Sequence, residues 1–208
     1  KSESNSKSKS ESNSKSESNS KGGDACTAQK RAQGFAAAFD IGTTTVAACL
    51  LKSGRPVKSI IRGNPQASYG ADVISRIHAC TEGRLSLLSK LITDCVRSMT
   101  EELCAGVCEG LDNITVAGNT VMLHIFASEN PAGMGSSPFT PVFTEAREYS
   151  GKHFGLNTEN VVLLPSVSAF IGADVTMGIL SSGILDAGEP TLLIDAGTNG
   201  EIALCMNG

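Results

Sequence analysis

The sequence contains no tryptophan, and two tyrosines and seven phenylalanines bring its aromatic content to only 4% of 208 residues. So few aromatic rings leave few platforms for stacking nucleic-acid bases. A basic stripe is also missing, because 17 Lys and Arg stand against 21 Asp and Glu for a net charge of −4. Nucleic acid is therefore not expected as a partner.

Long apolar runs are absent as well. The longest, 35–51, is interrupted by Asp40 and three threonines and is too polar for a transmembrane helix. The first residues include lysines but no apolar core of a signal peptide. The seven cysteines are odd in number and lack the spacing of a disulfide framework, which favours a reducing compartment. We expect a cytoplasmic protein that does not contact membranes.

The first 21 residues are a low-complexity segment of ten Ser, five Lys and three Glu, in which SESNSK occurs three times. This segment carries +2, whereas residues 22–208 carry −6. Such residues cannot bury enough apolar surface to offset chain entropy. The composition therefore predicts disorder over residues 1–33, as a linker, an expression artefact or a phosphorylatable arm.

Apolar patterning begins near Gly34. Three short runs joined by turns, 35–41, 46–51 and 57–62, predict an antiparallel meander. Helical spacing follows over 71–110, with a division at Gly83. The remaining predicted elements are a strand at 114–117, a helix at 120–127, a long connection with an edge strand at 141–144, a strand at 161–164, a helix at 168–180, and strands at 191–194 and 201–206. This order predicts an α/β fold whose mixed sheet joins the meander to parallel strands, with helices on both faces.

Two loops separated by 155 residues resemble each other: FDIGTTT ends the first strand, and IDAGTNG follows the strand at 191–194. Either loop alone could be an ordinary hairpin turn, but the pair suits the binding of a nucleoside triphosphate with Mg²⁺. Asp40 and Asp195 would hold the metal, mostly through water. The phosphates would contact glycine backbone, turn amides and hydroxyls of the intervening residues, which are Gly42, Thr43, Thr44, Thr45, Gly197, Thr198, Asn199 and Gly200.

With this pair of loops the sequence resembles the actin, Hsp70 and sugar-kinase superfamily of ATPases. The resemblance implies a ribonuclease H-like lobe at 34–190 and the start of a truncated second lobe at 191–208. It also implies that Pro165 to Ala173 belongs to the helix that connects the lobes and precedes the second phosphate loop.

Several longer strings resemble one branch of this superfamily, the ATP-dependent reductive activators of corrinoid proteins. The resemblance spans about 36–207 and rests on NPQ at 64–66, YGADVISRI at 69–77, AGNTVMLH at 117–124, SPFTPVF at 137–143 and LIDAGTNGEI at 193–202. It implies that ATP drives the one-electron reduction of Co(II) to Co(I). The implied partners are a corrinoid iron–sulfur protein, or a corrinoid methyltransferase component, and an electron donor, and a homodimer is left open.

Family members receive the electron from an iron–sulfur domain on the same polypeptide, but no four-cysteine pattern is present here. Counterparts of the adenosine-binding segment and of a second connecting helix are also missing. We therefore expect a fragment or one half of a split protein. Two alternatives stay open: a small-metabolite kinase of the same superfamily, and a non-catalytic nucleotide-binding or docking module.

Other polar residues admit two interpretations each. Asp72 and Asp174 both lie in Gly-Ala-Asp-Val strings, where a carboxylate would stabilise a helix N-terminus. A cleft role, orienting water or binding Mg²⁺, is the alternative, and we count Asp174 among the candidate catalytic residues with Asp40 and Asp195. Arg76 could contact phosphate or an acidic partner, but on an amphipathic helix it is predicted to be solvated. Asn119 is predicted to cap a helix rather than to act in a cleft, and His124 to lie in the core.

Overall fold

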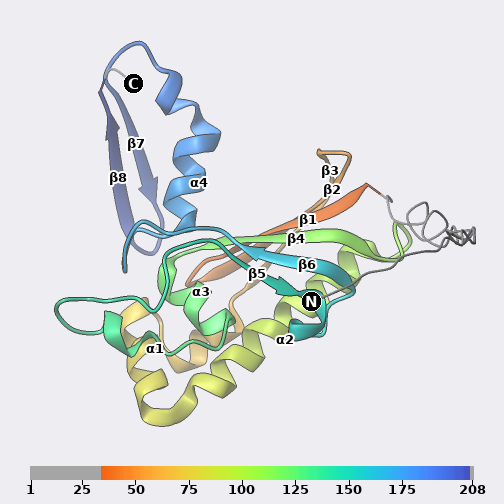
Figure 1. Cartoon of the computed structure of the whole chain (residues 1–208), viewed down its shortest axis with the longest axis horizontal. Coiled ribbons are helices and arrows are strands. Elements are labelled where there is room, and N and C mark those ends of the chain that lie inside the picture. The colour runs from red at the N-terminus through yellow and green to blue at the C-terminus, as the bar shows by residue number, and fades with distance from the viewer. Residues whose placement is uncertain (1–33, 207–208) are drawn as a thin grey trace, which may run out of the picture. The chain divides into compact units, whose positions relative to one another are not determined.

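The structure is a computed structural model that describes residues 34–206, so the predicted disorder of residues 1–33 lies outside the described residues. Residues 34–206 belong to a single unit of the chain (Figure 1). Within residues 34–206, no helix is long and apolar enough to cross a membrane.

The predicted meander is confirmed. Strands β1 (Phe35–Ile41), β2 (Thr45–Lys52) and β3 (Arg55–Gly63) pair in antiparallel order. Alternate residues of β1 are buried, with Phe39 2% and Ile41 0% exposed, whereas Asp40 between them faces the other side of the sheet. The strict alternation fixes which face of the strand joins the core.

The sheet has the strand order β3-β2-β1-β4-β6-β5. Strand β4 (Leu111–Gly118) runs parallel to β1, and β6 (Thr158–Leu163) runs parallel to β4. An antiparallel meander continued by parallel strands is the topology of the ribonuclease H-like lobe, and the predicted fold class is confirmed. The edge strand, however, is β5 (Arg147–Ser150) and not 141–144.

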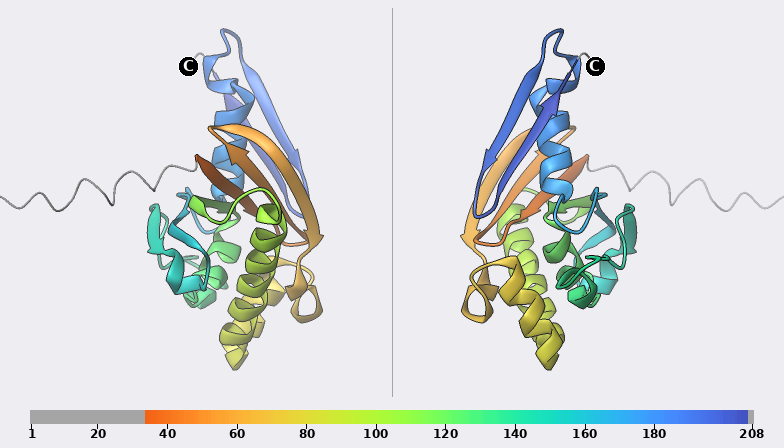
Figure 2. Two further views of the ribbon diagram at one scale, coloured as in Figure 1. Left: turned by 90° about the vertical axis from the view of Figure 1, so that its right-hand side faces the viewer. Right: turned by 90° about the vertical axis from the view of Figure 1, so that its left-hand side faces the viewer.

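Three helices cover one face of the sheet (Figures 1 and 2). They are α1 (Val73–Ala79), α2 (Leu85–Cys104) and α3 (Thr120–Phe126). Gly83, at φ 86°, divides the first two as predicted. Helix α2 ends six residues before the predicted end, and Gly106, at φ 71°, lies just beyond it in the left-handed region that favours glycine.

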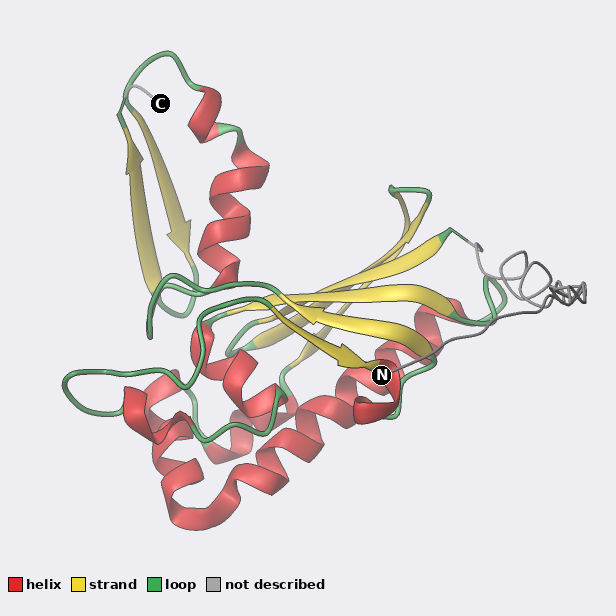
Figure 3. Ribbon diagram, viewed as in Figure 1, coloured by secondary structure: helices red, strands yellow, loops and turns green. Residues whose placement is uncertain are grey.

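Helix α4 (Ala173–Ser182) lies on the other side of the sheet, where Met177 faces Ala38 and Ala117. It leads to a separate two-stranded sheet of β7 (Thr191–Ala196) and β8 (Gly200–Cys205) (Figure 3). The prediction of a helix from 168 was wrong by five residues. Residues 165–172 form a loop, in which the amides of Val167 and Ser168 both donate to the carbonyl of Ile171.

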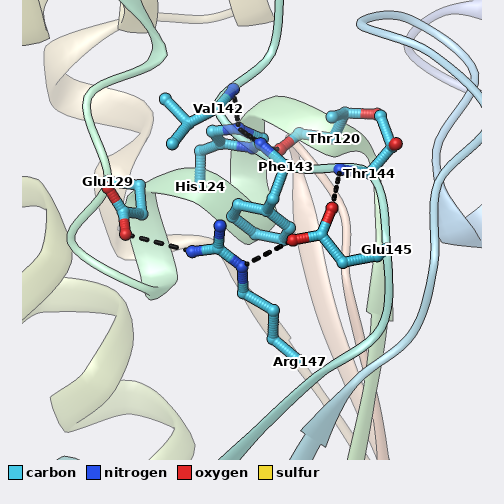
Figure 4. A network of polar contacts seen from close by, with 8 residues as sticks. All are labelled: Thr120, His124, Glu129, Val142, Phe143, Thr144, Glu145 and Arg147. Carbon is cyan, nitrogen blue, oxygen red and sulfur yellow. Dashed lines mark hydrogen bonds and ion pairs between the residues drawn. The ribbon is translucent and has the colours of Figure 1, made fainter.

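A buried histidine explains why 141–144 is not a strand (Figure 4). His124 is fully buried, as predicted, and its Nε2 accepts from the backbone amide of Val142 at 3.0 Å and faces that of Phe143 at 3.4 Å. Its Nδ1 then donates to the carbonyl of Thr120 at 2.7 Å, and its ring stacks on Phe143 at 4.2 Å. The backbone donors of this segment therefore serve the imidazole and not a strand ladder.

Charged residues surround this imidazole. Arg147 lies over the Phe143 ring and pairs with Glu129 and Glu145. Burial lowers the pKa of His124, with a smaller lowering by Arg147; the hydrogen bond to Thr120 and the two glutamates oppose it. The imidazole is thus neutral in the folded protein at pH 7.

This neutrality predicts how stability varies with pH. Between the lowered native pKa and the unfolded value of about 6.5, the unfolded chain binds more protons than the native one. The contribution of His124 is therefore complete above about pH 7 and is lost as pH falls, by up to about 1.4 kcal/mol per pH unit. Asn in place of His124 does not titrate. We expect the stability gap between the wild type and His124→Asn, measured by urea unfolding, to narrow as pH falls, whereas parallel curves would contradict the neutral imidazole.

Candidate functional site

The two similar loops face each other in the fold. The Oγ1 atoms of Thr44 and Thr198, 154 residues apart, are 2.7 Å from each other. Between the hairpins lies a pocket of about 170 Å³, here called the phosphate pocket. Its walls include every candidate residue of the sequence except Gly200, together with Asn119 and Glu201; the full lining is Asp40, Gly42, Thr43, Thr44, Thr45, Asn119, Asp174, Asp195, Gly197, Thr198, Asn199 and Glu201.

The first hairpin is held from behind by Asn64. The side-chain amide of Asn64 donates to the carbonyl of Gly42 at 2.8 Å, and its backbone amide donates to that of Thr44 at 2.8 Å. A Cβ at Gly42 would lie 2.9 Å from the carbonyl oxygen of Thr45, so glycine permits this tight turn. Asn64 thus anchors the turn through both its side chain and its backbone.

Arg76 is fully buried, and the prediction of a solvated arginine was wrong. Its guanidinium donates to the carbonyl of Thr43, to that of Gly70 at 3.1 Å and to Oε1 of Gln66 at 3.2 Å. Periodicity alone cannot reveal these acceptors, because they come from a loop and a hairpin rather than from the helix. Burial lowers the pKa of Arg76 to about 10, so the group stays charged at pH 7.

Asn119 both caps a helix and lines the phosphate pocket, the two roles considered for it from the sequence. Its Oδ1 accepts from the amide of Met122 at 2.9 Å and caps α3, as predicted. Its Nδ2 donates to Oγ1 of Thr43 at 3.0 Å, and the residue lines the pocket. Because Thr43 is only 4% exposed and its hydroxyl is engaged, Thr44 and Thr45 are better placed to offer a hydroxyl to a ligand.

Asp174 reaches the pocket because two backbones approach closely. Gly172, the N-cap of α4, lies where a Cβ would come 2.5 Å from Cα of Asn119 and 2.7 Å from the carbonyl oxygen of Gly118. Only glycine allows this contact between the start of α4 and the end of β4. Asp72 differs: it forms a capping box with Ser75 at the start of α1, so the helix-terminal role is confirmed, and it does not line the phosphate pocket.

The phosphate pocket concentrates negative charge. Partial desolvation raises the pKa of Asp40, although its side chain retains solvent access, and Asp174 and Asp195 raise it further. Desolvation also raises the pKa of Asp174, with Asp195 adding to it. Burial also raises the pKa of Glu201, and the charges of Asp174 and Asp195 raise it further.

Glu201 is the pocket residue that sequence reasoning missed. A signal existed in the predicted hairpin: Asp195 and Glu201 are direct partners across β7 and β8. Like charges opposite each other on antiparallel strands are destabilising. Such a pair indicates a site where a cation or a ligand offsets the repulsion.

The carboxylates fit Mg²⁺ held through water. Within residues 34–206, no three His, Cys, Asp or Glu side chains converge closely enough to ligate a metal directly. Mg²⁺ keeps several waters and is usually bound by one or two carboxylates together with phosphate oxygens. Mutually repelling carboxylates beside turn amides suit that mode, with Asp40 and Asp195 as candidates to hold the hydrated ion. An iron–sulfur cluster does not fit the described residues, because no three of their six cysteines converge on one point.

Comparison with known proteins identifies the family of this chain. Residues 35–187 match the family model described as "RACo middle region". The chain belongs to this family. It is 34% identical over 179 residues to the corrinoid activation enzyme RamQ of Eubacterium limosum, covering 80% of this chain and 30% of that protein. A solved structure titled a reductive activator for corrinoid, iron–sulfur protein matches 84% of this chain and 30% of its own, with a TM-score of 0.80 and 33% identity.

The chain therefore spans about 30% of the length of these relatives. The family match covers the sheet, α1 to α4 and the first hairpin, but ends before β7 and β8. The predicted boundary between two lobes at residue 190 stays a prediction. So do the roles of the individual pocket residues.

Replacement of Arg76 tests the support of the first hairpin. Met in its place would leave the carbonyls of Thr43 and Gly70 without their donor, at a cost of about 1–3 kcal/mol for each buried unsatisfied group. We expect Arg76→Met to lower the free energy of unfolding in urea by about 3 kcal/mol. Arg76→Lys should recover only part of this, because an ammonium cannot reproduce the guanidinium fork. Arg84→Met, at an exposed position, is the control, and equal effects at both positions would contradict the proposed support.

Neutralisation of Asp40 tests the charge repulsion. Because the pKa of Asp40 is raised in the native state, the folded protein binds more protons than the unfolded chain. Ionisation of Asp40 therefore lowers the free energy of unfolding as pH rises through that pKa. We expect Asp40→Asn to raise the thermal midpoint of the ligand-free protein modestly at pH 7, with no gain at acidic pH. Asp186→Asn, at an exposed carboxylate outside the pocket, should change neither. A lower midpoint for Asp40→Asn at pH 7 would show that repulsion does not dominate.

Proposed function

We propose that the chain binds the phosphates of Mg²⁺-ATP between its two hairpins and serves the ATP-dependent reductive activation of a corrinoid protein. The observation that carries this proposal is the phosphate pocket, in which two similar loops from distant parts of the chain enclose four carboxylates. The similarity to a corrinoid activation enzyme and to a reductive activator supports the corrinoid part. The reaction would reduce Co(II) to Co(I) with one electron from an iron–sulfur donor outside the described residues.

Each group of residues has a proposed task. The backbone of Gly42 and Gly197 permits close approach of phosphate oxygens, and the hydroxyls of Thr44, Thr45 and Thr198 donate to them. Bound Mg²⁺ would neutralise the developing charge on the phosphates. Asp40 and Asp195 would hold the hydrated ion through its water, and Asp174, at the start of α4, would orient the attacking water.

ATP can drive an unfavourable reduction only through a difference in binding. A nucleotide favours one arrangement of the hairpins by as much as it binds that arrangement more tightly. The contact of Thr44 with Thr198 is an element that such a difference can act on, since phosphate oxygens would compete for both hydroxyls. We propose that this change repositions the corrinoid partner and alters the ligation of its cobalt, and that hydrolysis then releases the partner.

The test follows the cobalt spectrum. The purified protein is mixed with a Co(II)-state corrinoid protein, a low-potential reductant and Mg²⁺-ATP, and the loss of Co(II) absorption is recorded. We expect an ATP-dependent loss that Asp195→Asn slows by about 10–100-fold, as for residues that support a metal through its water shell. Asp186→Asn should react at the wild-type rate.

Two other outcomes would redirect the proposal. A phosphorylated small molecule, detected when candidate metabolites replace the corrinoid protein, would indicate a kinase. Tight binding to a corrinoid protein with neither activity would indicate a docking module. Mg²⁺-ATP binding that survives both Asp40→Asn and Asp195→Asn would remove the nucleotide from this pocket.

A further inference from the structure

The first hairpin is held by the carbonyl groups of three consecutive residues, 42–44. Asn64 donates to the first and the last of them, through its side chain and its backbone amide, and Arg76 donates to the middle one. Asn64 and Arg76 are joined by Gln66, whose backbone amide donates to Oδ1 of Asn64 at 2.9 Å and whose Oε1 accepts from the guanidinium at 3.2 Å. All three residues are buried, and they are here called the buried cluster.

The amide of Thr44 points away from this cluster. In a planar trans peptide the N–H group lies opposite the C=O group. The amide of Thr44 shares its peptide with the carbonyl of Thr43, which faces Arg76, and Thr44 itself is exposed and lines the phosphate pocket. Within residues 34–206, no hydrogen bond occupies this amide. It is therefore a donor that a bound anion can use.

Arg76 places a full charge behind this donor. Every group that accepts a hydrogen bond from the buried guanidinium is uncharged: the carbonyls of Thr43 and Gly70, Oε1 of Gln66 and Sδ of Met122. In the part of the chain that the structure describes, no carboxylate forms an ion pair with it. Buried charges ordinarily have an opposite charge as partner. The guanidinium is thus fully hydrogen-bonded, but its charge is left to act on its surroundings.

The phosphate pocket needs such a charge. Its described lining contains four acids and no Lys, Arg or His. Phosphate oxygens that enter it are repelled by the carboxylates unless positive charge offsets the repulsion. Arg76 is separated from the pocket wall by the single peptide group between Thr43 and Thr44. With protein rather than water between charge and ligand, their attraction is only weakly screened.

We propose that Arg76 is the positive charge of the phosphate site and acts through the peptide group between Thr43 and Thr44, so that phosphate oxygens bind the amide of Thr44. Arg76 is a positioning residue, because it polarises the hairpin without touching the ligand. The inference rests on the proposed function for the identity of the ligand, an Mg²⁺-bound polyphosphate.

The first test compares two residues of the buried cluster. Arg76→Gln removes the charge and keeps an amide donor, whereas Gln66→Met removes two side-chain hydrogen bonds from the same cluster and leaves the charge. Affinities for Mg²⁺-ATP and Mg²⁺-pyrophosphate are measured by calorimetry, with folding checked by urea unfolding. We expect Arg76→Gln to weaken both by about tenfold or more, and Gln66→Met by less than about threefold. Equal losses would show a merely structural role and overturn the proposal.

The second test leaves the buried cluster intact, so it decides the question even where Arg76→Gln does not fold. Asp72 is an exposed N-cap of α1 whose negative charge acts on Arg76. Asn caps helices about as well as Asp, so Asp72→Asn changes the charge and keeps the cap. We expect it to tighten Mg²⁺-pyrophosphate binding about two- to threefold at low salt, with the gain lost at high salt.

Asp186→Asn is the matched control for this second test, because it removes the same charge at an exposed position outside the phosphate pocket. We expect it to leave the affinity unchanged. Equal gains in Asp72→Asn and Asp186→Asn would report net charge alone and overturn the role of Arg76. Unchanged or weaker binding by Asp72→Asn at low salt would overturn it as well.

The wild-type protein separates this inference from the proposed function. If it binds neither Mg²⁺-ATP nor Mg²⁺-pyrophosphate, the proposed function fails, and with it the ligand of this site. If it binds them and Arg76→Gln binds equally well, only the assignment of Arg76 is overturned.

Discussion

Electrostatic repulsion inside the phosphate pocket is the constraint on which the site depends. Three carboxylates, those of Asp40, Asp174 and Glu201, have raised pKa values because burial and the neighbouring acids disfavour their charged forms. A fold would not retain such a cluster for stability, since like charges in partial burial cost free energy. A bound cation would offset this cost, which is why the proposed function places Mg²⁺ in this pocket.

The rest of the fold keeps these carboxylates in place with uncharged or fully paired groups. Asn64 and Arg76 hold the first hairpin through its backbone carbonyls, and Asn119 ties Thr43 to the start of α3. Gly172 brings the start of α4 against the end of β4. Asn64, Arg76 and Gly172 do not line the pocket, yet each determines where a pocket residue lies, in the way that supporting residues orient a metal site.

A larger cavity of about 710 Å³, whose walls include Ile74, Val167 and Ile202, adjoins the phosphate pocket. One cavity is small, polar and acidic, and the other is larger and apolar, and they share Asn119, Asn199 and Glu201. Free energy can pass between two ligands only through residues that both affect, and these three residues are the ones that the two cavities share.

Local patterns in the sequence determined much of this protein. Several local features follow from short-range spacing and are confirmed: the meander of β1 to β3, the division at Gly83, the turns that hold the two acidic glycine–threonine loops, the cap at Asn119 and the core position of His124. These features depend on neighbours within a few residues, which a pattern records directly.

Tertiary structure alone decided the rest. Three features each depend on a partner far along the chain. Arg76 is buried against the carbonyl of Thr43, and the loop at 165–172 ends where Gly172 meets the backbone at Gly118. The edge strand is β5 because the imidazole of His124 engages the backbone of 142–143. The likeness of the two loops predicted that both serve one ligand, but only the fold shows that Oγ1 of Thr44 lies 2.7 Å from Oγ1 of Thr198. Spacing along the sequence does not show that such residues lie close together, because only the folded sheet and its helices bring them together.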